Sequence, residues 1–202
     1  MTAQFVHKAD FRTTAAVVLL CTELDPLTAR HQYRVSRLAT LMAQSIGLPQ
    51  EQVRAIQTAS LFHDIGKLKI PRRILLKPCK LDETEMAIVK EHPQIGYDIL
   101  INLGFPVDIA QMVLQHHERL DGSGYPHRIL DNQMYFGARV LAVVDVVDAM
   151  LFGRPYSNGH TIRETLVEIS QDKGQLYEPD IVEACVNNFE TIDFRRVFCE
   201  PN

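Results

Sequence analysis

The sequence lacks the features that define several classes of protein. It has no apolar run of about 18 residues or more, which a membrane-spanning helix needs, and no signal-peptide pattern at its N-terminus. Its formal net charge of −4 gives no basic excess of the kind that a broad nucleic-acid surface requires. We therefore expect a soluble cytoplasmic protein that binds no DNA or RNA and does not insert into a membrane.

Cysteine is also scarce, and its spacing excludes a zinc ribbon. The four cysteines form no CxxC pair: Cys21, Cys79, Cys185 and Cys199. A chain of 202 residues with 46% hydrophobic content can bury a substantial core without a disulfide scaffold. We expect reduced thiols and one domain that spans residues 1–202.

Helical periodicity is the dominant pattern that is present, and it predicts an all-α fold. Asp82 followed by Glu85 has the form of a helix N-terminal cap. The segment 135–151 has strand-like composition over 141–147, but its length and the helical context favour a helix. The expected helices cover residues 28–46, 50–63, 82–90, 107–117, 135–151, 161–171 and 179–189.

Histidine and aspartate gather at helix positions that the periodicity points inward. His31 continues an apolar stripe through Val35 and Leu38. His92 should sit at a helix end because Pro93 breaks the helix, and Gly66 should let the chain turn after Asp64. The whole set is His31, His63, Asp64, His92, His116, His117 and Asp145.

Each of these seven residues alone could be a satisfied core histidine or a capping aspartate. Together they fit a dinuclear metal centre better than a four-ligand zinc site, because imidazole binds transition metals and a carboxylate can bridge two ions. Iron is the first choice of metal and manganese the second.

Two motifs connect this set to a known family. They are His63-Asp64-Ile65-Gly66-Lys67 and the run from His116 to Pro126, which reads HHERLDGSGYP. In both motifs the chain resembles the HD-GYP family, a branch of the HD superfamily of metal-dependent phosphohydrolases. The resemblance extends from about residue 15 to residue 189. The resemblance implies a compact multi-helix HD-domain bundle with a GYP loop beside a dinuclear metal cleft.

The resemblance also implies roles for individual residues. His63, Asp64 and Asp145 would hold one metal, with His31 completing its ligands. Asp64 would bridge to a second metal held by His92, His116 and His117. Lys67 corresponds to a phosphate-contacting lysine, and Tyr125 and Arg154 to substrate contacts. Their structural alternatives are a helix-end cation for Lys67, a packed loop anchor for Tyr125 and a surface charge for Arg154.

Two positions depart from the family pattern. Some members hold a third metal through a glutamate where this chain has Leu27, which cannot ligate, so two metals are predicted. Ser157 replaces a basic residue that often follows the family's Arg-Pro-Tyr motif, which can alter substrate choice. Glu118 is expected to support a ligand histidine rather than to bind metal itself.

By this resemblance, the protein hydrolyses cyclic di-GMP to pGpG through a metal-bridging hydroxide, with Asp64 and Lys67 as catalytic residues. Further cleavage to GMP is left open. One alternative is the same chemistry on cyclic GMP-AMP, pGpG or another phosphoester. Another is a non-catalytic module that binds a cyclic dinucleotide, or that docks a signalling protein through the GYP loop.

Overall fold

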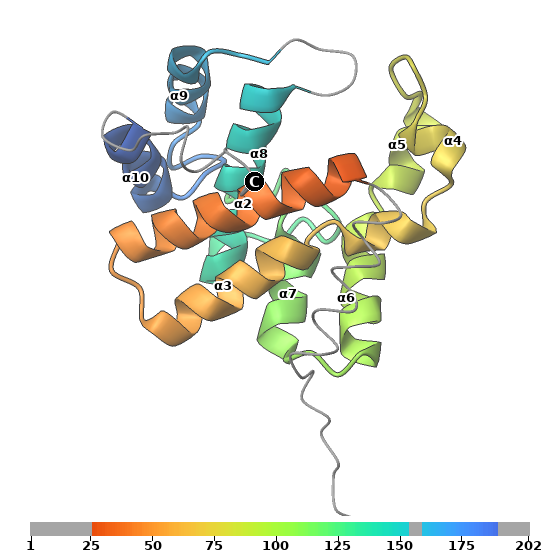
Figure 1. Cartoon of the computed structure of the whole chain (residues 1–202), viewed down its shortest axis with the longest axis horizontal. Coiled ribbons are helices and arrows are strands. Elements are labelled where there is room, and N and C mark those ends of the chain that lie inside the picture. The colour runs from red at the N-terminus through yellow and green to blue at the C-terminus, as the bar shows by residue number, and fades with distance from the viewer. Residues whose placement is uncertain (1–25, 154–158, 190–202) are drawn as a thin grey trace, which may run out of the picture.

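The structure, a computed structural model, describes residues 26–153 and 159–189. Within these ranges the secondary structure is helical and contains no strand, so the predicted all-α fold is confirmed (Figure 1). No helix in the described ranges is long and apolar enough to cross a membrane.

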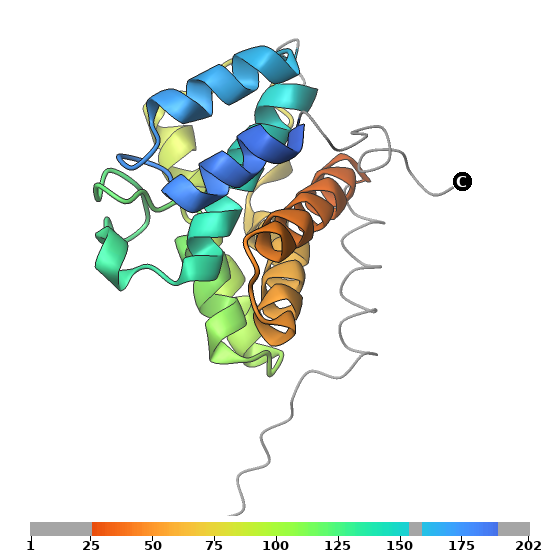
Figure 2. The same ribbon diagram turned by 90° about the vertical axis from the view of Figure 1, so that its left-hand side faces the viewer.

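A pair of helices forms one wall of the bundle. Helix α2 (Pro26–Ser45) and helix α3 (Gln50–Phe62) lie side by side, joined by a short turn in which Gly47 has a φ of +76° (Figures 1 and 2). Glycine adopts this left-handed conformation without steric cost, which suits it to a helix end. Leu38 and Met42 of α2 are fully buried against the rest of the core.

Helix α8 (Phe136–Phe152) packs against both members of this pair and forms the centre of the bundle. Its buried side chains lie on several sides of the helix: Ala138, Val140, Leu141, Ala142, Val143, Val144 and Val147. A helix that is apolar nearly all round belongs in a core. Burial explains the strand-like composition of this segment, and the helix prediction is confirmed.

Helix α6 (His92–Asn102) and helix α7 (Val107–Gln115) form a second packed pair, and α7 also contacts α3 and α8. The 3-10 helix η1 (Ile65–Lys69) lies against α6. The sequence prediction missed α6, because Pro93 was expected to end a helix at His92. Instead Pro93 occupies the first turn of α6, where its missing N–H would have no partner in any case.

The remaining elements form two lobes on opposite sides of α8 (Figure 1). One lobe holds the short helices α4 (Arg72–Leu75) and α5 (Glu83–Val89). The other holds α9 (Ile162–Gln171) and α10 (Pro179–Phe189). The 3-10 helix η2 (Asp131–Gln133) precedes α8. Asp82 caps α5 through a reciprocal pair of hydrogen bonds with Glu85, as predicted.

Candidate metal centre

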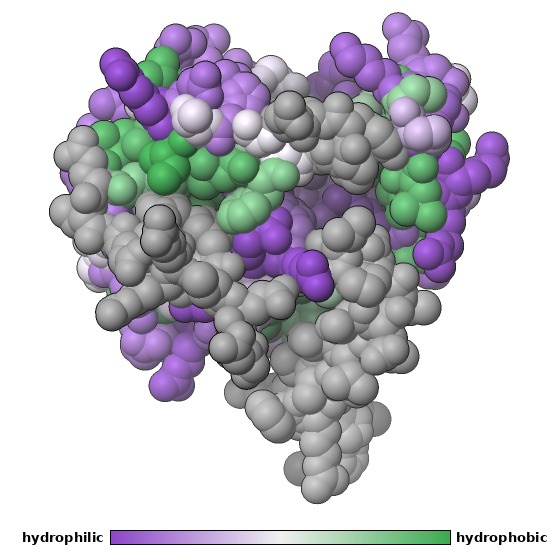
Figure 3. All heavy atoms as spheres, turned by 45° about the horizontal axis from the view of Figure 1, so that its top comes forward, coloured by the Kyte–Doolittle hydropathy of each residue, from purple (hydrophilic) through white to green (hydrophobic). Residues whose placement is uncertain are grey.

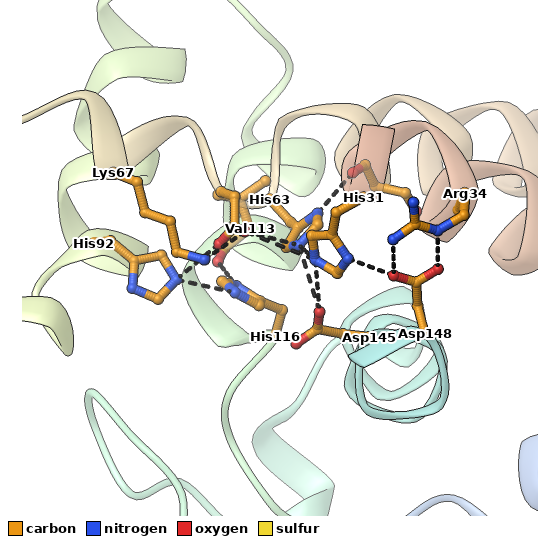
Figure 4. A network of polar contacts seen from close by, with 11 residues as sticks. His31, Arg34, His63, Lys67, His92, Val113, His116, Asp145 and Asp148 are labelled. Carbon is orange, nitrogen blue, oxygen red and sulfur yellow. Dashed lines mark hydrogen bonds and ion pairs between the residues drawn. The ribbon is translucent and has the colours of Figure 1, made fainter. Parts of the chain in front are cut away.

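Seven side chains from different parts of the chain meet where the helices converge. Figure 4 labels His31, His63, His92, His116 and Asp145 among them. His31 comes from α2 and Asp145 from α8, while the others lie at or just beyond helix ends. Two sets of three residues each bring their donor atoms within 4.8 Å of one another. They are His31, His63 and Asp64 in the first set, and His92, His116 and His117 in the second.

Backbone carbonyls fix the orientation of three of the histidine rings. The Nδ1 atom of His63 lies 2.7 Å from the carbonyl oxygen of Ser60. The Nδ1 atom of His92 lies 2.7 Å from the carbonyl oxygen of Val89. The Nδ1 atom of His116 lies 2.6 Å from the carbonyl of Val113. Each acceptor is in the last turn of α3, α5 or α7, where carbonyls lack helical partners. With Nδ1 donating its proton, each ring turns a bare Nε2 toward the centre.

These Nε2 atoms approach one another in pairs. The Nε2 atoms of His31 and His63 are 3.2 Å apart, and those of His92 and His116 are 3.3 Å apart. Two imidazole lone pairs at such distances repel each other unless a proton or a cation lies between them. The donor chemistry therefore fits a divalent metal ion in each set, because neutral imidazole nitrogen is a ligand that such ions prefer.

Asp64 belongs to the first set and also faces the second, with one oxygen toward a histidine of each. Its Oδ1 is 3.3 Å from Nε2 of His92, while its Oδ2 is 3.5 Å from Nε2 of His63. Asp145 lies on the other side of the first set, with Oδ1 3.1 Å from Nε2 of His31. This arrangement places Asp64 where a bridging carboxylate would stand.

The protonation states favour cation binding. Burial would raise the pKa of Asp64, but Lys67 and the neighbouring histidines hold it well below its usual value. Burial would also raise the pKa of Asp145, but His31 and His63 hold it well below its usual value. Burial lowers the pKa of His117 to about 3. Ionised carboxylates and neutral imidazoles are the forms that ligate metals.

His31 differs from the other histidines because two carboxylates face it. Burial lowers the pKa of His31, but Asp145 and Asp148 outweigh that effect and raise it to about 9. Without a metal ion the ring therefore carries a proton at neutral pH. A cation bound at this position would displace that proton.

Lys67 and Tyr125 both contact the predicted ligands. The Nζ atom of Lys67 lies 2.6 Å from Oδ2 of Asp64. The ring of Tyr125 stacks on that of His117, with centroids 4.7 Å apart, and Lys90 lies over the Tyr125 ring at 5.2 Å. These contacts hold the Tyr125 ring against the predicted ligand His117. Arg154 and Ser157 lie outside the described residues, as does the side chain of Leu27.

Gly66 is needed for close packing and not for a turn, so the expected reason for a glycine there was wrong. Its φ is not in the left-handed region. A Cβ at this position would lie 1.9 Å from the carbonyl oxygen of His92 and 2.8 Å from the backbone nitrogen of Gly96. The missing side chain therefore lets η1 touch the first turn of α6, which positions His92 beside Asp64.

Glu118 organises the GYP loop. It is fully buried, and its Oε1 accepts hydrogen bonds from the backbone N–H groups of His127 at 2.7 Å and Arg128 at 3.1 Å. Among the described residues no ligand histidine donates to Glu118, so the expected support of a histidine was wrong. Gly124 allows the loop to fold back, since a Cβ there would lie 2.4 Å from Cα of Glu118.

Sequence reasoning missed two residues that hold His31. Asp148 is 1% exposed and accepts a hydrogen bond from Nδ1 of His31 at 2.6 Å. Arg34 donates to both oxygens of Asp148, at 2.7 and 2.9 Å. The available signal was that Asp148 follows Asp145 by three residues, which places both on one helix face.

Replacing Asp148 with asparagine should weaken metal binding roughly 10- to 100-fold, the usual cost of losing an acceptor behind a ligand histidine. The variant keeps the shape of the side chain but loses the charge that orients His31. Competition with a fluorescent chelator measures the affinity. Asp98→Asn, an exposed change on α6, is the control. Equal affinities for Asp148→Asn and the control would contradict this role.

Comparison with known proteins agrees with the geometry. A model of the HD domain family matches residues 17–181. The chain belongs to the HD domain family. Its two long motifs and their order are those of the HD-GYP branch, as the sequence predicted.

Curated relatives of this HD domain include two kinds of phosphodiesterase. The chain is 42% identical to the cyclic di-GMP phosphodiesterase response regulator RpfG of Xanthomonas campestris, over 79% of this chain and 43% of that protein. It is 34% identical to the 3′3′-cGAMP-specific phosphodiesterase 2 of Vibrio cholerae, over 81% of this chain and 32% of that protein. The chain thus spans less than half the length of either relative.

Among solved structures, the HD domain superposes on an HDG"Y"P protein from Bdellovibrio bacteriovorus with a TM-score of 0.67. The two are 17% identical, and the match covers 89% of this chain and 63% of that one. At that identity the likeness concerns the fold.

Proposed function

We propose that this HD domain is a metal-dependent phosphodiesterase that hydrolyses cyclic di-GMP to pGpG. The observation that carries the proposal is the pair of three-residue donor sets, with Asp64 of the first set also facing His92 of the second. The similarity to RpfG supports the choice of substrate. A hollow lined by hydrophilic residues, between the α4–α5 lobe and the α9–α10 lobe, gives a phosphate substrate a polar surface to approach (Figure 3).

We assign the first set, with Asp145, to one divalent ion and the second set to another, with Asp64 shared between them. Iron is the first choice and manganese the second, since both suit mixed imidazole and carboxylate ligation. When bound, two such ions would polarise phosphoryl oxygens and lower the pKa of the attacking water.

The remaining chemistry falls to side chains of the protein. The Lys67 ammonium, 2.6 Å from Asp64, supplies a fixed positive charge at the centre that can stabilise a phosphoryl group as negative charge builds up. Tyr125, beside His117, and Arg154 are the proposed substrate contacts. Asp148 and Arg34 keep the His31 ring oriented.

The test uses protein purified without oxygen, with its metals quantified. Cyclic di-GMP, cyclic GMP-AMP and pGpG are supplied in parallel, before and after chelation and re-addition of iron or manganese. We expect turnover of cyclic di-GMP with about two metals per chain, lost on chelation and restored by metal.

The similarity to the Vibrio cholerae enzyme supports cyclic GMP-AMP as the second candidate substrate. Faster hydrolysis of that dinucleotide would reassign the substrate within the same chemistry. Metal-loaded protein that binds a cyclic dinucleotide without cleaving any substrate would favour a binding or docking module. Recruitment of a signalling protein by the GYP loop remains a prediction.

A further inference from the structure

A cavity of about 140 Å³ lies directly beside Asp64 and Lys67, between α2, η1 and α4. Pockets that enclose a whole drug-sized ligand measure roughly 300–1,000 Å³. This cavity can therefore take one part of a larger molecule. Because it adjoins the proposed catalytic centre, the part it takes must lie close to the scissile phosphate.

Gln32 is a largely buried residue that lines this cavity. The residue is 4% exposed, and no other part of the chain that the structure describes forms a hydrogen bond with its side chain. Neither of its amide atoms is among the fully buried polar atoms that lack a partner within the described ranges, so the amide is not cut off from solvent and can bond a ligand that enters the cavity. The amide offers a donor and an acceptor side by side, which fits a ligand edge with the complementary pair.

The rest of the cavity combines apolar surface with positive charge. Leu68 and Leu76 line it and are 46% and 59% exposed, so they offer apolar surface that a ligand can contact. Arg72 also lines the cavity and forms no ion pair within the described residues. Lys67 contributes a second cation at the side nearest the metal centre.

We infer that this cavity is the recognition subsite for one purine base of the cyclic dinucleotide, an inference that rests on the proposed function. A purine has two apolar faces for the leucines and an edge that pairs a donor with an acceptor. Guanine presents O6 next to N1–H, and adenine presents N7 next to the N6 amino group. Gln32 binds that edge, and Arg72 donates to the acceptor atoms of the base.

The experiment compares a substrate that has bases with one that has none. Gln32→Leu and Arg72→Gln are assayed on cyclic di-GMP and on bis(p-nitrophenyl) phosphate. Arg73→Gln is the matched control, because Arg73 shares the exposed helix α4 but does not line the cavity. We expect kcat/KM for cyclic di-GMP to fall roughly tenfold or more in the first two variants, mainly through KM. Activity on the base-free diester and metal content should stay unchanged, and the control should match wild type.

Two results would overturn the subsite. One is an equal loss on both substrates, which would mean that Gln32 only supports its neighbour His31. The other is no loss on either. If wild-type protein cleaves no cyclic dinucleotide, the proposed function fails, and GMP binding measured by calorimetry tests the subsite separately. Weaker GMP binding by Gln32→Leu supports the subsite, and equal binding by wild type and Gln32→Leu refutes it.

Discussion

Changing Asp64 to alanine should lower phosphodiester turnover by roughly a thousandfold or more, because each metal ion supplies several kcal/mol of transition-state stabilisation. The two oxygens of Asp64 face histidines of both donor sets, at 3.3 Å from His92 and 3.5 Å from His63. Its loss should release at least one ion. Metal analysis and single-turnover kinetics on the same preparation measure both effects.

The Asp64→Ala variant should keep its fold. A loss of turnover could then be attributed to loss of metal and not to unfolding. Far-ultraviolet circular dichroism should remain that of the wild type, since within residues 26–153 and 159–189 the Asp64 side chain bonds Lys67 and no backbone group. Asp64→Asn, which keeps the shape of the side chain and removes its charge, should behave like the alanine variant. An asparagine variant with two metals and wild-type turnover would exclude a bridging role for the charge.

Changing Gly66 to alanine should destabilise the protein by about 3 kcal/mol and remove the second metal. Overpacking in a core costs about 1–3 kcal/mol and sometimes more, and here the added Cβ would lie 1.9 Å from a backbone oxygen that no side-chain rotation can move. Either η1 or the first turn of α6 must shift. His92 would then move away from Oδ1 of Asp64. Urea unfolding gives the stability, and metal analysis gives the stoichiometry.

Gly47→Ala provides the comparison for this second prediction. Gly47 has a φ of +76°, yet a Cβ there would meet nothing within 4 Å. Its replacement should cost only the backbone strain, about 1–2 kcal/mol, and leave metal content unchanged. If Gly66→Ala bound two metals as tightly as Gly47→Ala, the contact between η1 and His92 would not be what positions the ligand.

The sequence predicted most of the helices because their signals are local. The cap at Asp82 and the apolar character of residues 135–151 act within one segment, and both appear in the structure as expected. The spacing of histidines and aspartates likewise indicated a common centre. The structure brings those seven side chains together, while their roles as ligands await the metal measurements above.

What the sequence did not predict depends on contacts between distant segments. Asp148 could not be paired with His31, 117 residues away, from local patterns. The helix that starts at His92 depends on packing against η1 and α7, which Pro93 alone does not indicate. Glu118 was linked to a ligand histidine by proximity in sequence, whereas its partners are nine and ten residues further along the chain.

The carbonyls that hold His63, His92 and His116 also affect the thermodynamics of metal binding. Each ring is tied to the helix turn that ends just before it, so its rotamer is set once that helix has formed. A metal ion would therefore meet ligands that have already lost most of their side-chain entropy, which leaves a smaller entropic cost for binding. Inserting one residue between the anchoring carbonyl and its histidine would rotate the ring by about 100°. The histidine would still be present, but its Nε2 atom would point away from the centre.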